Sequence, residues 1–189
     1  MTAHSLLWRT LDAPGHDACR YRRDPIGWIT EGASVFGEDG RVHALTYRLR
    51  CDHDWNSRSA SVEGWIGDAA FALELARNAD GGWTVDGQHA PGLAGCLDID
   101  LGLTPATNIN AMRRLALAAG ERRSLVAVWL DTEDWSVKPL PQSYHRITDD
   151  AYDYASPHND FRARLRVDRF GAVADYEGIW TSEAVPPAD

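Results

Sequence analysis

The chain has 189 residues, a length that usually forms one domain and can bury about 70 per cent of its unfolded surface. Its 28 acidic and 19 basic residues give a formal net charge of −9. This charge disfavours nucleic acids and anionic membranes as partners, because a phosphate backbone needs a basic stripe and none is visible. We therefore expect a single domain over residues 1–189, with residues 185–189 as a tail.

The N-terminal sequence MTAHSLLWRTLDAPG has neither a basic region nor a long apolar region, and no apolar run reaches 18 residues. Secretion and a membrane span therefore lack support. Cys19, Cys51 and Cys96 are widely spaced, which fits neither a metal knuckle nor an even set of disulfides. We expect a soluble, cytoplasmic protein with three free thiols.

Alternating apolar and polar residues predict β-strands along much of the chain. Residues 42–51, VHALTYRLRC, and 70–76, AFALELA, place their large apolar side chains on one face. Segments rich in glycine and aspartate or asparagine, at residues 37–40, 78–82 and 168–171, predict hairpin turns. Period-2 patterns of this kind favour a sheet with one face on the core.

Residues 96–101, CLDIDL, contain the most informative strand. In this reading three aliphatic residues share one face, while Asp98 and Asp100 share the other. Thr104 and Pro105 then end the strand, because proline lacks a ladder N–H and biases its predecessor away from helix.

Twin arginines follow this turn. Residues 109–119 have helical spacing before a glycine and predict the only helix, although the segment is short enough to be a strand. If the chain doubles back, Arg113, Arg114 or Arg58 could form charge-assisted hydrogen bonds with the two aspartates. The alternative is a solvated strand face followed by a surface helix.

Two later segments complete the prediction. Residues 125–130, LVAVWL, are apolar on both faces and predict a central covered strand. Residues 161–168, FRARLRVD, alternate strictly, with three arginines on one face. About a dozen strands predict an all-β or β-dominated antiparallel roll, barrel or sandwich with at most one short helix.

Motifs for easily recognised chemistry are absent. The sequence contains no nucleophile elbow, P-loop, dinucleotide fingerprint or HExxH, so we expect neither catalysis nor a cofactor. Seven scattered histidines do not suggest a metal site. Asp98 and Asp100, two residues apart, also need not straddle a glycosidic bond as glycosidases require.

Aromatic residues beside polar donors are better candidates for a ligand cleft. The chain has eight tryptophans and six tyrosines, and aromatic rings stack well on sugars and apolar tails. Trp55 with Arg58, and Gln142 with Tyr144, each combine an aromatic ring with a polar donor near a predicted strand end. The alternative role for any one of these rings is core packing.

Several segments together resemble the putative glycolipid-binding family of bacterial proteins, over about residues 8–180. They are WNSR at 55–58, GGW at 81–83, LAGCLDIDLGLTPATNINAMRRL at 93–115, QSY at 142–144, YDY at 152–154 and FRARLRVDRFGAVADYEGIW at 161–180. The resemblance implies a spiral β-roll similar to the periplasmic carriers that shuttle lipoproteins to the outer membrane. The segment TPATNINAMRRL departs from the family pattern, which is nearer TPFTNTLPIRRL, and Glu177 stands where proline is expected.

We therefore expect non-enzymatic binding of an amphiphilic small molecule, a glycolipid by this resemblance, in the cleft of the roll. The expected ligand-binding residues are Trp55, Arg58, Asp98, Asp100, Arg113, Arg114, Gln142 and Tyr144. One alternative is an enzyme acting on a sugar or lipid conjugate, with Asp98 or Asp100 as general base. Another is a structural or interaction protein with no ligand. The sequence leaves the ligand and the oligomeric state open.

Overall fold

The computed structural model describes residues 3–157 and 160–184, so the expected tail at 185–189 lies outside the described residues. The described chain forms one large β-sheet and one short α-helix, which confirms the β-dominated class. The strands are β1 (His4–Thr10), β2 (Gly15–Asp24), β3 (Gly27–Glu38), β4 (Arg41–Cys51), β5 (Ser57–Ile66), β6 (Ala69–Arg77), β7 (Trp83–Val85), β8 (Gln88–His89), β9 (Asp98–Leu101), β10 (Arg122–Leu130), β11 (Val137–Thr148), β12 (Ala151–Ser156), β13 (Phe161–Val167), β14 (Val173–Tyr176) and β15 (Trp180–Glu183).

The sheet has 15 strands in the order β8-β7-β6-β5-β4-β3-β2-β1-β15-β14-β13-β12-β11-β10-β9. Each strand pairs antiparallel with its neighbour except β9, which is parallel to β10. The pairing of β1 with β15 joins two meanders, one from each half of the chain. The free edges of the sheet are therefore β8 and β9.

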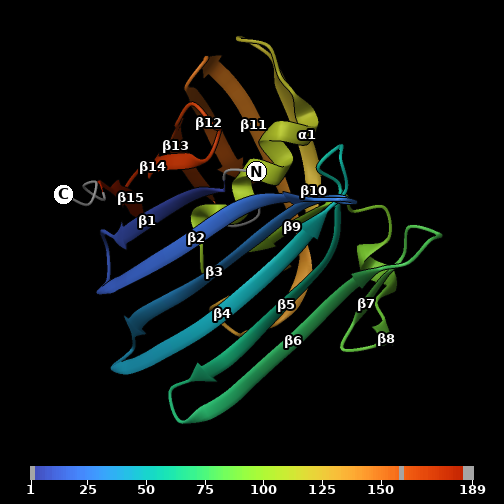
Figure 1. The fold of residues 1–189 in the computed structure, drawn as a ribbon, viewed down its shortest axis with the longest axis vertical. Coiled ribbons are helices and arrows are strands. Elements are labelled where there is room, and N and C mark those ends of the chain that lie inside the picture. The colour runs from blue at the N-terminus through green and yellow to red at the C-terminus, as the bar shows by residue number, and fades with distance from the viewer. Residues whose placement is uncertain (1–2, 158–159, 185–189) are drawn as a thin grey trace.

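The sheet rolls up so that its β9 edge meets the middle of the N-terminal meander. The backbone N–H of Ser57, at the start of β5, donates to the carbonyl of Leu97 at 2.8 Å. The hydroxyl of Ser57 accepts a hydrogen bond from the N–H of Ile99 at 3.1 Å. These bonds turn an open sheet into a spiral roll, and Figure 1 shows the α-helix lying between its two halves.

The alternation expected for the strands is confirmed where one face covers the core. In β13, Ala163 and Leu165 are buried while Arg162, Arg164 and Arg166 are exposed. The turn at residues 37–40 joins β3 to β4, and its Asp39-Gly40 pair has φ values of 49° and 73°. Such a turn suits the right-handed twist of a hairpin.

The predicted helix is shorter than the sequence pattern indicates. It is α1 (Asn108–Leu115), preceded by the 3-10 turn η2 (Pro105–Thr107). Ala116 adopts a left-handed conformation, with φ 46° and ψ 43°, and its N–H bonds the carbonyl of Met112. The helix therefore ends at Ala116, and the predicted continuation to residue 119 is wrong. A second 3-10 turn, η1 (Pro91–Leu93), precedes β9.

The expectation of a strand covered on both faces at 125–130 holds only in part. Ala127, Val128 and Leu130 are fully buried in β10, but Val126 is 42 per cent exposed. The reason is that β9 pairs only with Ala127–Leu130, so the earlier part of β10 extends beyond the rolled edge. No helix in the described chain is long and apolar enough to cross a membrane.

Candidate functional site

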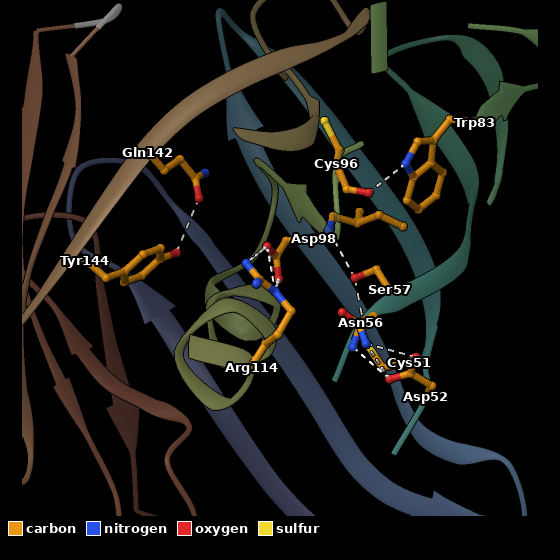
Figure 2. Close-up of polar contacts among 11 residues, drawn as sticks. Cys51, Asp52, Asn56, Ser57, Trp83, Cys96, Asp98, Arg114, Gln142 and Tyr144 are labelled. Carbon is orange, nitrogen blue, oxygen red and sulfur yellow. Dashed lines mark hydrogen bonds and ion pairs between the residues drawn. The ribbon is translucent and has the colours of Figure 1, made fainter. Parts of the chain in front are cut away.

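The two aspartates of β9 have different partners. Ile99 and Leu101 of this strand enter the main core, so Asp98 and Asp100 share the opposite face, as alternation predicts. Asp98 accepts hydrogen bonds from Arg114 of α1 at 3.0 Å and 3.1 Å from Nε and 2.5 Å from Nη2. Figure 2 shows this forked contact between strand and helix. The predicted pairing with an arginine is therefore correct for Asp98.

The side chains of the Asp98–Arg114 pair are largely shielded from solvent. The side chains are 3 and 17 per cent exposed, respectively. Burial raises the pKa of Asp98, and the hydrogen bonds and charge of Arg114 oppose that shift. Both carboxylate oxygens are occupied by one arginine, so this pair ties α1 to β9 and leaves little capacity for a ligand.

Asp100 has no arginine partner in the described part of the chain, and the predicted pairing is wrong for it. Its carboxylate instead accepts a hydrogen bond from Nε2 of Gln142 on β11. The Tyr144 hydroxyl is 3.5 Å from Oε1 of Gln142 (Figure 2). Nδ2 of Asn108 donates to that hydroxyl at 3.0 Å. Burial raises the pKa of Asp100 to about 6, while Gln142 lowers it and the nearby charge of Asp98 raises it.

Asp100 opens on an interior pocket of about 270 Å³ inside the roll. Its walls come from the β9–α1 segment and from β10–β15, so they unite segments about 80 residues apart. The lining residues are Asp100, Gly102, Thr104, Asn108, Trp129, Thr132, Leu140, Tyr154, Ser156, Phe161, Tyr176, Ile179 and Trp180. The pocket thus combines one carboxylate, one side-chain amide, several hydroxyl groups and five aromatic rings.

A second pocket of about 130 Å³ adjoins the interior pocket. The two share Gly102, Thr132, Ile179 and Trp180. The second pocket adds the side chains of Phe36 and Leu103 and reaches the loops that follow β1 and precede β4, where Asp12 and Glu38 are exposed. We call this outer cavity the channel pocket.

The matched family model covers residues 5–182 and is described as "Putative glycolipid-binding". The chain belongs to this family. A DUF1089 family protein from Pseudomonas aeruginosa has a similar crystal structure, with 31 per cent sequence identity and a TM-score of 0.79. The match covers 92 per cent of this chain and 94 per cent of the other. No match was found among the curated proteins.

In this family member, two other predicted site residues, Arg58 and Trp55, lie away from the interior pocket. Arg58, in β5, pairs at 2.6 Å with Asp52 of the β4–β5 loop. Trp55 is buried and stacks on Trp28, with ring centroids 4.5 Å apart. Both residues hold one end of the roll together.

Arg113 also points away from the interior pocket. It donates to the carbonyl of Phe170, in the β13–β14 turn. Its guanidinium carbon lies 5.4 Å from the centre of the Phe170 ring and 6.0 Å from that of Trp55. The twin arginines therefore make different contacts: Arg114 binds Asp98 of β9, and Arg113 binds the β13–β14 turn.

A larger hollow of about 850 Å³ lies on the outer face of β1–β5. Its floor consists of small residues such as Ala18, Gly32 and Ala33. The charged groups at its edge already pair with one another, as Glu31 does with Arg20 and Arg48. We therefore place the candidate site in the interior pocket, where polar groups converge, rather than in the larger hollow.

Sequence reasoning identified Asp100 and its neighbour Gln142 but missed most of the pocket lining. The predicted site residues do not include Trp129, Ser156, Tyr176 or Trp180. Tyr154 and Ser156 nevertheless lie on one face of β12. This shared face was the available signal. The described residues contain no cluster of three or more histidine, cysteine, aspartate or glutamate side chains placed to hold a metal ion.

Proposed function

We propose that this protein binds an amphiphilic small molecule, a glycolipid, without catalysing a reaction on it. The polar head would occupy the interior pocket, and the start of the apolar part would occupy the channel pocket. One observation carries the proposal: the pocket that Asp100 lines adjoins, through shared walls, a second pocket that Phe36, Leu103, Ile179 and Trp180 line. Membership of the glycolipid-binding family supports the ligand class.

The interior pocket suits a hydroxylated head. Asp100 and Asn108 provide an acceptor and an amide, and Thr104, Tyr154 and Ser156 provide hydroxyl groups. Aromatic walls such as Trp180 can stack on the apolar face of a sugar ring. A volume of about 270 Å³ lies near the ~300 Å³ lower limit of typical ligand pockets, which suits about one sugar ring and excludes long acyl chains.

The chemistry of the pocket favours binding over hydrolysis. Asp100 has the raised pKa expected of a general base, which is the argument for the enzymatic alternative. Glycoside hydrolysis, however, commonly uses two carboxyl groups on either side of the scissile bond. The interior pocket receives one carboxylate, because Asp98 is occupied by Arg114.

Titration with methyl, propyl and butyl glucosides tests the proposal, with binding followed by calorimetry. We expect affinity to rise with chain length, by up to ~0.8 kcal/mol for each methylene buried in the channel pocket. Chemical analysis of the recovered glucosides should show no cleavage. Equal affinity across the series would contradict the amphiphile proposal, and free glucose in the recovered sample would favour the enzyme.

A matched pair of variants separates this site from the outer hollow. Thr132→Trp should fill the junction of the two pockets and abolish the gain with chain length, because Thr132 lines both. Thr46→Trp places the same side chain in the outer hollow and should leave binding unchanged. The opposite outcome would move the apolar part of the ligand to the outer face.

A further inference from the structure

Asp100 has no cationic partner among the described residues. Within the described chain, no lysine, arginine or histidine lies within ion-pair distance of it, since the neighbouring Arg114 contacts Asp98. The side chains that hydrogen-bond to Asp100, those of Gln142 and Thr107, are both neutral. A carboxylate that is withdrawn from water is normally paired with a cation. Among the described residues, the partly buried Asp100 therefore leaves the interior pocket with an unbalanced negative charge whenever it is ionised.

Three of the aromatic rings that line the same pocket are neighbours of one another. The ring centroids of Tyr154, Phe161 and Tyr176 are separated by 6.0, 6.0 and 6.1 Å, and each pair is inclined by 52° to 71°. The faces of aromatic rings are negative and attract cations within about 6 Å. Arginine or lysine covers rings elsewhere, as Arg146 covers Tyr152, but no such contact involves these three rings in the described residues.

The two pockets also contain a hydroxyl group without a hydrogen-bond partner among the described residues and two further acidic side chains. Ser156 is 2 per cent exposed, lines the pocket, and its hydroxyl has no hydrogen-bond partner among the described residues. A buried polar group of this kind calls for a partner such as a ligand or water. At the outer end, Asp12 and Glu38 add negative charge to the channel pocket.

We infer that the head group bound in the interior pocket carries a protonated amine, which pairs with Asp100 between the rings of Tyr154, Phe161 and Tyr176. This inference rests on the proposed function and specifies its ligand class. An amino sugar and an ethanolamine-type head share this chemistry. Phosphate, sulfate and uronic acid heads are disfavoured, because they would place a second negative charge beside Asp100.

A panel of soluble probes tests the inference on the intact protein. Glucosamine is compared with glucose, and ethanolamine with ethylene glycol, by two-dimensional NMR with the amides of Asp100 and Ser156 as reporters. We expect the amine of at least one pair to bind about tenfold more tightly, a factor that corresponds to ~1.4 kcal/mol. A gain with glucosamine alone indicates an amino sugar, and a gain with ethanolamine alone indicates the lipid-type head.

Two variants, each lacking one negative charge, test whether the preference for the amine depends on Asp100. Asp100→Asn should remove the preference for the amine over its neutral partner. Glu63→Gln, on the outer face, should retain it. Melting curves establish that both variants fold, and the probe comparison on the unmodified protein stands without them.

The outcomes distinguish this inference from the proposed function. Equal affinity for amines and neutral partners would overturn the amine assignment while leaving a polar-head site in place. A preference that survives in folded Asp100→Asn would also overturn it. If no probe shifts the Asp100 and Ser156 amides, and the alkyl glucosides also fail to bind, the proposed function itself fails.

Discussion

Asp17 is an acidic residue with an unusual environment at the centre of the roll. It is fully buried in β2, and its Oδ1 accepts a hydrogen bond from the Tyr47 hydroxyl at 2.8 Å. That hydroxyl is also 3.1 Å from Oγ1 of Thr104, in the segment that lines the interior pocket. Oδ2 of Asp17 has no partner among the described residues. Burial raises the pKa of Asp17 from 3.8 to about 7, against the opposing effect of the Tyr47 and Thr104 hydrogen bonds.

This shift predicts a stability that falls with pH. Between the unfolded pKa of 3.8 and the folded pKa of about 7, the folded state binds more protons than the unfolded state. The free energy of unfolding therefore decreases as pH rises from about 4 to 7, by up to about 4 kcal/mol, and levels off above. Asp100, with its pKa raised to about 6, adds to the same slope.

Asp17→Asn should remove much of this pH dependence. Urea unfolding at pH 5 and pH 8 should show the variant gaining on the unmodified protein by on the order of 3 kcal/mol between the two pH values. Glu63→Gln, at an exposed position, controls for the loss of one charge. If the stability of Asp17→Asn and of the unmodified protein depended equally on pH, folding would not raise the pKa of Asp17 and the prediction would be wrong.

At the scale of elements, α1 ends through backbone geometry that alanine tolerates poorly. Its last turn carries Arg113 and Arg114, which interact favourably with the negative C-terminal end of a helix. Ala116 then takes the left-handed conformation usually reserved for glycine, at a cost of roughly 1 kcal/mol. The buried Leu117 that follows explains why the chain must turn there.

Ala116→Gly should therefore stabilise the protein, by up to about 1 kcal/mol, because glycine adopts positive φ without strain. Ala94→Gly provides the control, since Ala94 is exposed and has φ −57°. That control should be neutral or destabilising. Thermal melting of both variants measures these changes in stability. A loss of stability in Ala116→Gly would mean that packing of the Ala116 Cβ outweighs the backbone strain.

At the scale of the whole molecule, the contact between β5 and β9 closes the roll. Ser57 is fully buried and joins the two strands through its backbone N–H and its hydroxyl. The sheet edge at β9 is thereby placed inside the molecule, where it does not present an exposed pairing edge. This closure also orients Asp98 towards Arg114 and Asp100 towards the interior pocket.

Ser57→Ala should destabilise the protein by about 1 to 3 kcal/mol, because the buried N–H of Ile99 loses its acceptor. Ser59→Ala, two residues along β5, is the matched control; Ser59 forms no side-chain hydrogen bond within the described chain. Hydrogen exchange should show faster exchange at Ile99 in Ser57→Ala and unchanged exchange in β2 and β3. Equal stability of the two variants would mean that the roll closes by apolar packing alone.

The sequence by itself determined the β-dominated class, the faces of strands such as β13, and the shared face of Asp98 and Asp100. These features follow from period-2 alternation, which is local and independent of the rest of the fold. The roll alone decided that Asp98 meets Arg114 and that Asp100 meets Gln142, 42 residues away in sequence. A local pattern shows which way a side chain faces, whereas its partner depends on the register and curvature of distant strands. For that reason the aromatic walls around Asp100 emerged only from the tertiary structure.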